Sequence, residues 1–219
     1  MKILIILCSN EFSRINIENI KTLKYQFDNL KDSIVDYCGI SSQNDFENYE
    51  DVLSFKYKIV NSNRQLSKVC DFISDYKNEL DYDWFIKTRT EVNLIDMIDF
   101  SVLDTNSINA RARVYRGPKQ IKYGMSVNGE GCWKNIGDCF YTRYETEIIL
   151  DDIIYIFHKT LVDNGAFDKF YDEKNELQHE WFHNKIWKDR NVNFNVIGMN
   201  LMLTKYGPCH SGHLNYDSD

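Results

Sequence analysis

The stretch "DYDWFIKTRTEV", residues 81–92, contains a short apolar run between two groups of charged residues. The run "WFIKT" has the length and character of a strand buried inside a sheet. In open α/β sheets, ligands bind at the carboxyl ends of the strands. We therefore expect Arg89 and Glu91, which follow the run, to face a ligand. Asp81 and Asp83 spell the pattern D-x-D, but they precede the run and are expected to form a turn at its amino end.

Strand and helix patterns alternate before and through this stretch. Continuous or alternating apolar residues predict strands, and apolar residues at helical spacing predict helices. The expected strands cover residues 2–8, 33–40, 56–60 and 83–92, and the expected helices cover residues 16–30 and 63–80. Such alternation is typical of a mostly parallel, doubly wound α/β sheet flanked by helices. No Pro- or Ser-rich linker divides the chain, and we expect a single domain over residues 1–219.

The second half is less regular. Residues 111–122 carry five basic side chains, and this glycine-containing region is expected either to cover a ligand crevice or to be a solvated loop. The sequence then predicts a short strand at 138–144 and a helix over 145–165 that ends at Gly165. A further helix is expected over 175–190, followed by two short strands within 193–207.

Composition excludes several classes of protein. The net charge of -7 argues against a general nucleic-acid binder. No apolar run reaches the length of a membrane span, and "ILIILC" lacks the flanks of a signal peptide, so we expect a cytoplasmic protein. No C-x-x-C occurs, and the cysteines are expected to be buried thiols; they are Cys8, Cys38, Cys70, Cys132, Cys139 and Cys209.

The segment "HEWFH", residues 179–183, matches the zinc-hydrolase pattern H-E-x-x-H. A zinc site of this kind needs a third ligand downstream. No glutamate follows Glu180, and Ile186 stands where the extended form of the pattern requires glycine. We therefore interpret the segment as part of an amphipathic helix rather than a zinc site.

The motif strand resembles that of a known family. "YDWFIKTRTEV" is similar to the pattern YD-(three apolar)-(K/R)-x-R-x-D-(apolar) of GT-A glycosyltransferases that make lipopolysaccharide and capsule, or that large DNA viruses carry. Ordinary members end this strand in D-x-D. Arg89 then takes the place of the first aspartate and Glu91 that of the last, which usually contacts metal. The resemblance implies that Glu91 binds Mn²⁺ or Mg²⁺, while Lys87 and Arg89 offset the charge of a diphosphate.

Other segments resemble the same family in the same order along the chain. "CSNEFSR" and the start of "NRQLSKVCDFI" imply nucleotide contacts by Ser9, Arg14 and Arg64. "NIGDCFYT" and "HEWFH" imply that Asp138 or Glu180 is the catalytic base, with Glu180 slightly preferred. The segment "GPCHSGH" adds His210 and His213, either as further metal ligands or as part of an exposed tail.

The resemblance implies a single GT-A domain that transfers a sugar, a hexose or deoxyhexose, from a nucleotide-diphosphate sugar to a hydroxyl of a glycan or glycoprotein. UDP is the commonest nucleotide in such donors. Two alternatives remain open. The first is a nucleotidyltransferase or a sugar-nucleotide hydrolase on a similar sheet, and the second is a protein that only binds sugars or nucleotides through a degenerate D-x-D site. A zinc hydrolase based on HEWFH ranks behind both.

Overall fold

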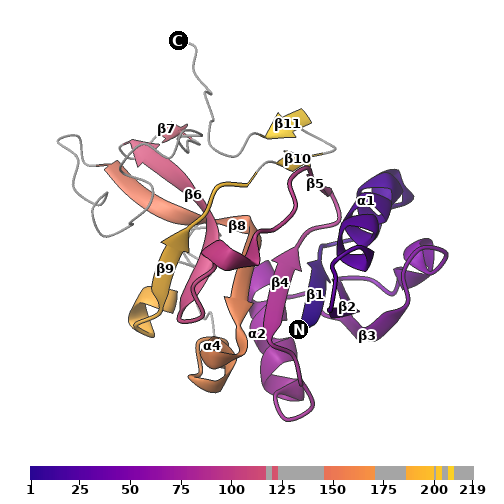
Figure 1. Ribbon diagram of the computed structural model, residues 1–219, viewed down its shortest axis with the longest axis horizontal. Helices are drawn as coiled ribbons and strands as arrows, with labels where there is room; N and C mark the ends of the chain where they lie inside the picture. Colours follow the sequence, from indigo (N-terminus) through magenta and orange to yellow (C-terminus); the bar gives the residue numbers. More distant parts are fainter. Residues whose placement is uncertain (117–119, 123–145, 171–185, 200, 204–206, 210–219) are drawn as a thin grey trace.

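The computed structural model describes residues 1–116, 120–122, 146–170, 186–199, 201–203 and 207–209 (Figure 1). Its centre is an eight-stranded sheet in the order β3-β2-β1-β4-β8-β6-β7, with β9 paired to β6. The strands are β1 (Lys2–Cys8), β2 (Ile34–Ser41), β3 (Phe55–Val60), β4 (Trp84–Thr88), β6 (Ser107–Arg116), β7 (Gln120–Lys122), β8 (Thr146–His158) and β9 (Asn193–Val196). The β1–β2, β2–β3, β1–β4 and β6–β9 pairs are parallel, which confirms a mostly parallel α/β sheet.

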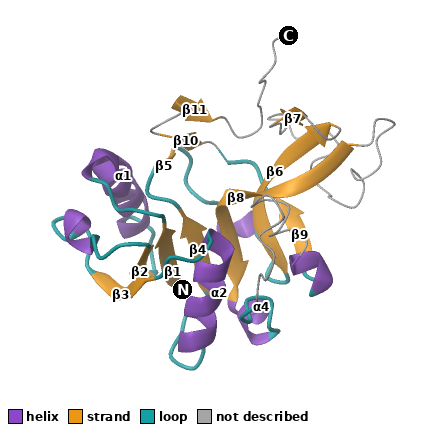
Figure 2. Cartoon of the chain, turned by 180° about the vertical axis from the view of Figure 1, so that it is seen from behind, coloured by secondary structure: helices purple, strands orange, loops and turns teal. Residues whose placement is uncertain are grey.

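Helices cover both faces of this sheet because side chains alternate along its strands. In β1, Leu4 and Ile6 belong to the apolar cluster under α2 (Gln65–Tyr76), whereas Ile3 and Ile5 belong to the cluster under α1 (Ile17–Asp28). Figure 2 shows α2 crossing the sheet face in front of β1 and β4. α1 begins and ends within two residues of the expected 16–30, whereas α2 begins two residues after and ends four residues before the expected 63–80.

The strand order reverses direction between β1 and β4. From β1 the chain moves outward to β2 and β3, and it then returns to place β4 on the other side of β1. At such a topological switch point the connections leave the sheet toward opposite faces, so a crevice opens at the carboxyl ends of the two central strands. Ser9 follows β1 there, and residues 89–91 follow β4.

Residues 89–91 form a tight turn that joins the central sheet to a smaller one. The backbone N–H of Val92 donates to the carbonyl of Arg89 at 3.2 Å. The chain then enters β5 (Val92–Leu94), which pairs with β10 (Leu201–Leu203), and β10 pairs with β11 (Gly207–Cys209). In Figure 1 this small sheet lies beyond the carboxyl end of β4. The strand expected over 83–92 is therefore two strands separated by the turn.

The helix expected over 145–165 is wrong for most of its length. Residues 146–158 form β8, which is antiparallel to β4 and β6, and only Lys159–Asp163 are helical, as α4. Successive residues of β8 face opposite sides: Ile154 and Ile156 join the cluster under α1, and Tyr155 and Phe157 join the cluster under α2. A strand buried on both faces reads as a continuous apolar run, which periodicity does not separate from a helix.

Several other predictions from the sequence agree with the structure in its described residues. Cys8, Cys38 and Cys70 are buried free thiols. Two short strands, β9 and β10, occupy the expected 193–207 segment, and residues 186–189 are helical. None of the helices in the described part of the chain is long and apolar enough to cross a membrane. The strand expected at 138–144 and the first part of the helix expected at 175–190 lie outside the described residues.

The expected helix end at Gly165 is confirmed. Gly165 has a φ of +79°, and its N–H donates to the carbonyl of Val162 at 3.2 Å. A Cβ at this position would stand 2.7 Å from a carboxylate oxygen of Asp168.

We expect Gly165→Ala to lower the free energy of unfolding by about 1–2 kcal/mol, because a left-handed conformation is costly for alanine. Urea denaturation measures the change. Gly198→Ala is the matched control, since its Cβ would meet no atom within 4 Å. Equal effects at both sites would contradict this explanation.

Candidate functional site

Ser9 connects the carboxyl ends of β1 and β4. Its Oγ accepts hydrogen bonds from the N–H of Thr90 at 2.9 Å and from the Thr90 hydroxyl at 3.1 Å. The same hydroxyl donates to a carboxylate oxygen of Glu91 at 3.4 Å. From α1 and the turn before it, Asn19 donates to the Thr90 carbonyl at 3.2 Å and Asn16 to its hydroxyl at 3.4 Å. These bonds hold the turn after β4 against the loop after β1.

A cavity of about 550 Å³ opens beside this network. The loop after β1 and the turn after β4 supply most of its wall. Its lining residues are Ser9, Asn10, Glu11, Ser13, Ile15, Asn16, Gln43, Arg89, Thr90 and Glu91. Of these, Ile15 is 75% exposed and gives the cavity an apolar side chain. We refer to this space as the switch-point cavity.

The charged residues of the turn are paired with each other. The Arg89 guanidinium forms an ion pair with the Glu91 carboxylate, and the two side chains are 31% and 20% exposed. Arg89 Nε is buried and has no hydrogen-bond partner, although this arginine is a strong donor. The pair thus presents a cation and a carboxylate together on the cavity wall.

The ion pair of Arg89 with Glu91 limits how this cavity could bind a metal ion. Glu91 and Glu11 are the carboxylates on the cavity wall, and the described residues contain no group of three or more possible metal ligands. Mg²⁺ and Mn²⁺ are often held by one or two carboxylates together with substrate phosphates. Glu91 fits that pattern only when a phosphate ligand completes the sphere and Arg89 turns to the phosphate. Metal binding by Glu91 stays a prediction, and His210 and His213 lie outside the described residues.

Three predicted contacts lie away from the switch-point cavity. Lys87 is fully buried, and its Nζ donates to Gln65 Oε1 at 2.7 Å and lies 5.3 Å from the centre of the Tyr155 ring. Arg14 forms an ion pair with Asp51 at 2.7 Å on the surface. Arg64 precedes α2 and lines a larger cavity, about 730 Å³, near the carboxyl end of the edge strand β3. Among the described residues, Ser9, Arg89 and Glu91 are therefore the predicted site residues that the fold brings together.

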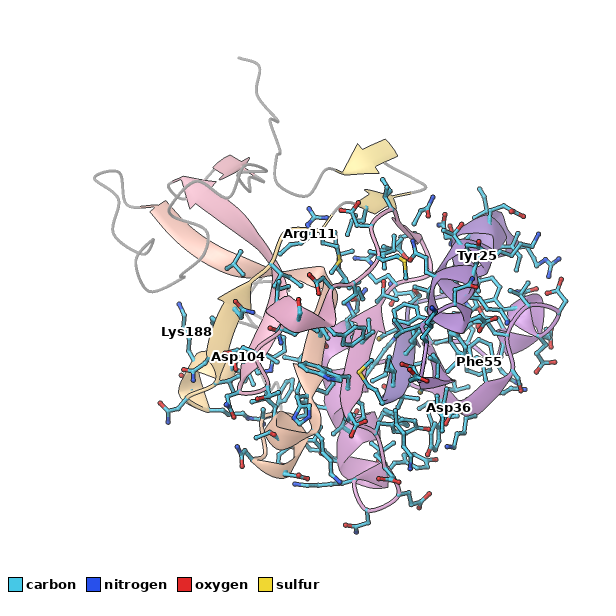
Figure 3. The ribbon with its side chains drawn as sticks, in the orientation of Figure 1. Tyr25, Asp36, Phe55, Asp104, Arg111 and Lys188 are labelled. Carbon is cyan, nitrogen blue, oxygen red and sulfur yellow. The ribbon has the colours of Figure 1, made fainter. Side chains whose placement is uncertain are left out.

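The literal D-x-D, residues 81–83, lies at the amino ends of the strands, opposite the switch-point cavity, as expected. Asp83 accepts a hydrogen bond from the backbone N–H of Lys2 at 2.7 Å, and Asp81 forms an ion pair with the Lys2 ammonium at 2.5 Å. Between them, the Tyr82 hydroxyl donates to Asp36 at 2.6 Å. Asp36 lies low in the view of Figure 3, toward the amino ends of the strands. These carboxylates fix strand ends and do not reach the crevice.

The basic segment from residue 111 begins inside the protein rather than in a solvated loop. Arg111 lies on β6, next to an irregularity in the pairing of β6 with β8, and is fully buried (Figure 3). The segment continues as the end of β6 and as β7, and residues 117–119 lie outside the described part of the chain. Asp138 and Glu180, the candidate bases, also lie outside it.

Sequence reasoning missed one residue near the cavity. Lys68 of α2 is fully buried, and its Nζ donates to the carbonyl of Ser9 at 3.0 Å and to Ser42 Oγ at 2.8 Å. A signal was present, because Lys68 lies one helical turn before the buried Phe72 and next to the buried Val69. A lysine in the apolar stripe of a helix needs a polar partner inside the fold.

No protein-family model matches the chain, and no curated protein matches its sequence. Among solved structures, the chain is similar to a CMP:2-keto-3-deoxy-manno-octonic acid synthetase complexed with CTP, with a TM-score of 0.54 and 9% identity over 90% of this chain and 88% of that chain. It is also similar to a protein assigned as a glucose-1-phosphate thymidylyltransferase from Bacillus anthracis, in complex with sucrose. That match has a TM-score of 0.50 and 10% identity over 93% of this chain and 89% of that chain.

A third solved structure, A197 from STIV, matches 100% of this chain and 99% of that chain at 9% identity, with a TM-score of 0.47. At sequence identities this low, structural similarity indicates a shared fold and not a shared function. We draw no conclusion from the match with a TM-score below 0.5. The two stronger matches are nucleotidyltransferase-like structures. The chain therefore has the mostly parallel α/β fold that enzymes of nucleotide-sugar metabolism use.

Proposed function

We propose that this protein is a transferase of nucleotide-sugar metabolism that holds the nucleotide portion of its substrate in the switch-point cavity. The observation that carries the proposal is the meeting of Ser9 and Glu91 beside that cavity. The two residues come from adjacent strands on either side of the switch point, where open α/β sheets bind their ligands.

Each part of the cavity has a chemical task in this proposal. Arg89 exchanges its bond to Glu91 for the diphosphate, because a diphosphate carries more negative charge than one carboxylate and a guanidinium group can bind two of its oxygens at once. Glu91 then faces a divalent cation that the diphosphate also binds, Mn²⁺ or Mg²⁺. The exposed Ile15 covers one face of the base or ribose. Asp138 or Glu180 remains the proposed base for the acceptor.

Glycosyl transfer is one form of this reaction, and the turn after β4 favours it. An acceptor hydroxyl of a glycan or glycoprotein attacks the anomeric carbon, and the nucleoside diphosphate leaves. The cation on the cavity wall then stabilises the departing diphosphate. The loop at residues 9–13, "SNEFS", contains no glycine and includes Glu11. Such a loop is poorly suited to wrap a triphosphate, which glycine-rich loops do through their backbone N–H groups.

Nucleotidyl transfer is the other form, and the solved structures support it better than they support glycosyl transfer. The two matches with TM-scores of 0.50 and 0.54 are a thymidylyltransferase and a CMP-sugar synthetase by their descriptions. In this reaction a sugar oxygen or sugar phosphate attacks the α-phosphorus of a nucleoside triphosphate, and pyrophosphate leaves. The same cavity would hold the nucleotide in both reactions.

One experiment separates these possibilities. Purified protein is screened for thermal stabilisation by nucleotides, nucleotide sugars and nucleoside triphosphates, with and without Mn²⁺. A ligand at 100 times its Kd adds about 2.7 kcal/mol of stability, which is readily measured. Stabilising pairs are then assayed for turnover: release of nucleoside diphosphate that depends on an acceptor indicates glycosyl transfer, and release of pyrophosphate that depends on a sugar phosphate indicates nucleotidyl transfer.

The remaining outcomes are also informative. Stabilisation without turnover in any assay would leave a sugar-nucleotide-binding protein, the second alternative from the sequence. Stabilisation by no nucleotide, with or without Mn²⁺, would refute the proposal. Hydrolysis of a nucleotide sugar at the same rate with and without an acceptor would indicate a hydrolase and would refute the transferase assignment.

A further inference from the structure

Lys68 places a positive charge directly behind the loop that lines the switch-point cavity. Its ammonium group has three protons and three oxygen neighbours: the carbonyl of Ser9 at 3.0 Å, Asn10 Oδ1 at 3.4 Å and Ser42 Oγ at 2.8 Å. Ser9 and Asn10 follow β1, and Ser42 follows β2. One side chain from α2 thus joins the carboxyl ends of two neighbouring strands.

This charge has no carboxylate partner among the described residues. All three acceptors are neutral, and no ion pair of the described part of the chain includes Lys68. Burial lowers the pKa of Lys68, while the nearby Cys8 and Asp45 act in the opposite direction. Burial also raises the pKa of Cys8, so its thiol stays neutral and does not offset the ammonium charge. A buried, unpaired charge is costly, and a hydrophobic residue would pack here at lower cost.

Two contacts transmit the effect of Lys68 to the cavity. The Ser9 carbonyl is fixed by Lys68, while the Ser9 hydroxyl contacts Thr90 and Glu91. An ammonium group only donates, so the oxygen of the Asn10 amide faces Lys68 and its NH₂ group faces away. Asn10 is exposed and lines the cavity. Lys68 therefore leaves the NH₂ group of Asn10, on the cavity wall, available to donate to a ligand.

We propose that Lys68 is the residue that makes the switch-point cavity selective for an anionic ligand, a nucleoside diphosphate, by placing its charge behind Ser9 and Asn10 and orienting the donors of that loop. The proposal rests on one part of the proposed function, the binding of a nucleotide in the switch-point cavity. It does not depend on which transfer reaction the protein catalyses. Lys68 acts through Ser9 and Asn10, so it is a positioning residue and not a catalytic one.

The charge balance of the wall explains why such a residue is needed. Glu11 and Glu91 bring two carboxylates to the cavity, whereas Arg89 brings one cation that is already paired with Glu91. A diphosphate would meet a net negative wall. Lys68 adds a positive charge from inside, behind the same loop, where water screens it less than a surface charge.

The test compares charged and neutral ligands of the same cavity. Isothermal titration calorimetry gives the Kd of UDP, uridine and inorganic pyrophosphate for the wild type, Lys68→Met, Lys68→Arg and the control Lys24→Met. Lys24 is a surface lysine of α1 that pairs with Asp28. In Lys68→Met we expect the preference for UDP over uridine to fall by at least about tenfold, because the interaction with the charged portion is lost. Pyrophosphate should weaken by a similar factor, and Lys68→Arg should restore most of the preference.

A purely structural role predicts a different pattern. If Lys68 only ties the loops together, UDP and uridine weaken by the same factor and the preference for UDP is unchanged, which overturns the proposal. An unchanged affinity of Lys68→Met for pyrophosphate overturns it as well, and so does a wild type that binds neither UDP nor pyrophosphate. If Lys68→Met does not fold, Lys68→Gln takes its place under the same criteria, since glutamine retains polar contacts with the loop.

These outcomes are distinct from a failure of the proposed function. Pyrophosphate binding that depends on Lys68, together with no turnover of any nucleotide substrate, would support the role of Lys68 and refute the transferase. If the wild type turns over a nucleotide sugar and Lys68→Met keeps the same preference for UDP over uridine, the transferase is supported and the role of Lys68 is refuted.

Discussion

Glu91→Gln is expected to lower kcat/KM for the proposed transferase reaction by about 100- to 1000-fold, the size of effect known for removing one preorganised group that stabilises charge in a transition state. Glutamine has nearly the same shape and still accepts the hydrogen bond from Ser9. It lacks the charge that holds Arg89 in place and that would bind a divalent cation. The substitution therefore changes the charge of the turn after β4 with little change in its packing.

The control is Glu18→Gln, which makes the same chemical change on the exposed face of α1, where Glu18 pairs with Lys21. We expect its activity to equal that of the wild type. Thermal unfolding of Glu91→Gln should show a loss of about 1–2 kcal/mol at most, because the pair with Arg89 is partly exposed. Full turnover in a folded Glu91→Gln protein would show that Glu91 takes no part in the reaction.

Phe157→Ala is expected to lower the free energy of unfolding by about 3–5 kcal/mol, the range for truncating a large aromatic residue in a packed core. Phe157 is fully buried in β8. Its ring stacks on Phe85 of β4, with ring centres 5.1 Å apart, and on Phe167, with ring centres 3.9 Å apart. Truncation leaves a cavity between the sheet and the segment that follows α4. Urea denaturation monitored by fluorescence and by circular dichroism measures the loss.

Tyr25→Ala provides the comparison at a solvated position. Tyr25 lies on α1 (Figure 3). Its side chain is 72% exposed, so its removal should change stability by less than about 0.5 kcal/mol. A similar small loss for Phe157→Ala would contradict the placement of β8 between the two apolar clusters. The contrast therefore tests the element for which sequence periodicity was misleading.

Local pattern was sufficient for the first half of the fold. β1, β2, β3, α1 and α2 each bury residues at a spacing that the sequence displays, and the neighbouring elements along the chain also pack together. β8 was predicted as a helix because its apolar residues, continuous over 153–157 and interrupted only by Asp151 and Asp152, fit a buried helix as well as a buried strand. Its pairing with β4 and β6 is a long-range interaction, and the backbone hydrogen bonds of those strands override local preference.

The site was predictable only in part. The rule on strand ends selected Glu91 and Arg89 over Asp81 and Asp83, and the fold places the two groups at opposite ends of β4. Lys87 was assigned to the ligand although it shares a face of β4 with Phe85, two residues earlier, and so lies inside under α2. Lys68 was overlooked because its partners come from two segments, after β1 and after β2, that only the folded chain brings next to α2.

The small sheet sets an order for the completion of the site during synthesis. The turn that carries Glu91 leads directly into β5, whose only strand partner among the described residues is β10, more than a hundred residues later. A chain emerging from the ribosome can form β1, β2, β3 and β4 early, since those strands pair among themselves. β5 has to wait until residue 203 has emerged. A nascent chain of this protein can thus pair β1 to β4 before its ligand turn is anchored on both sides.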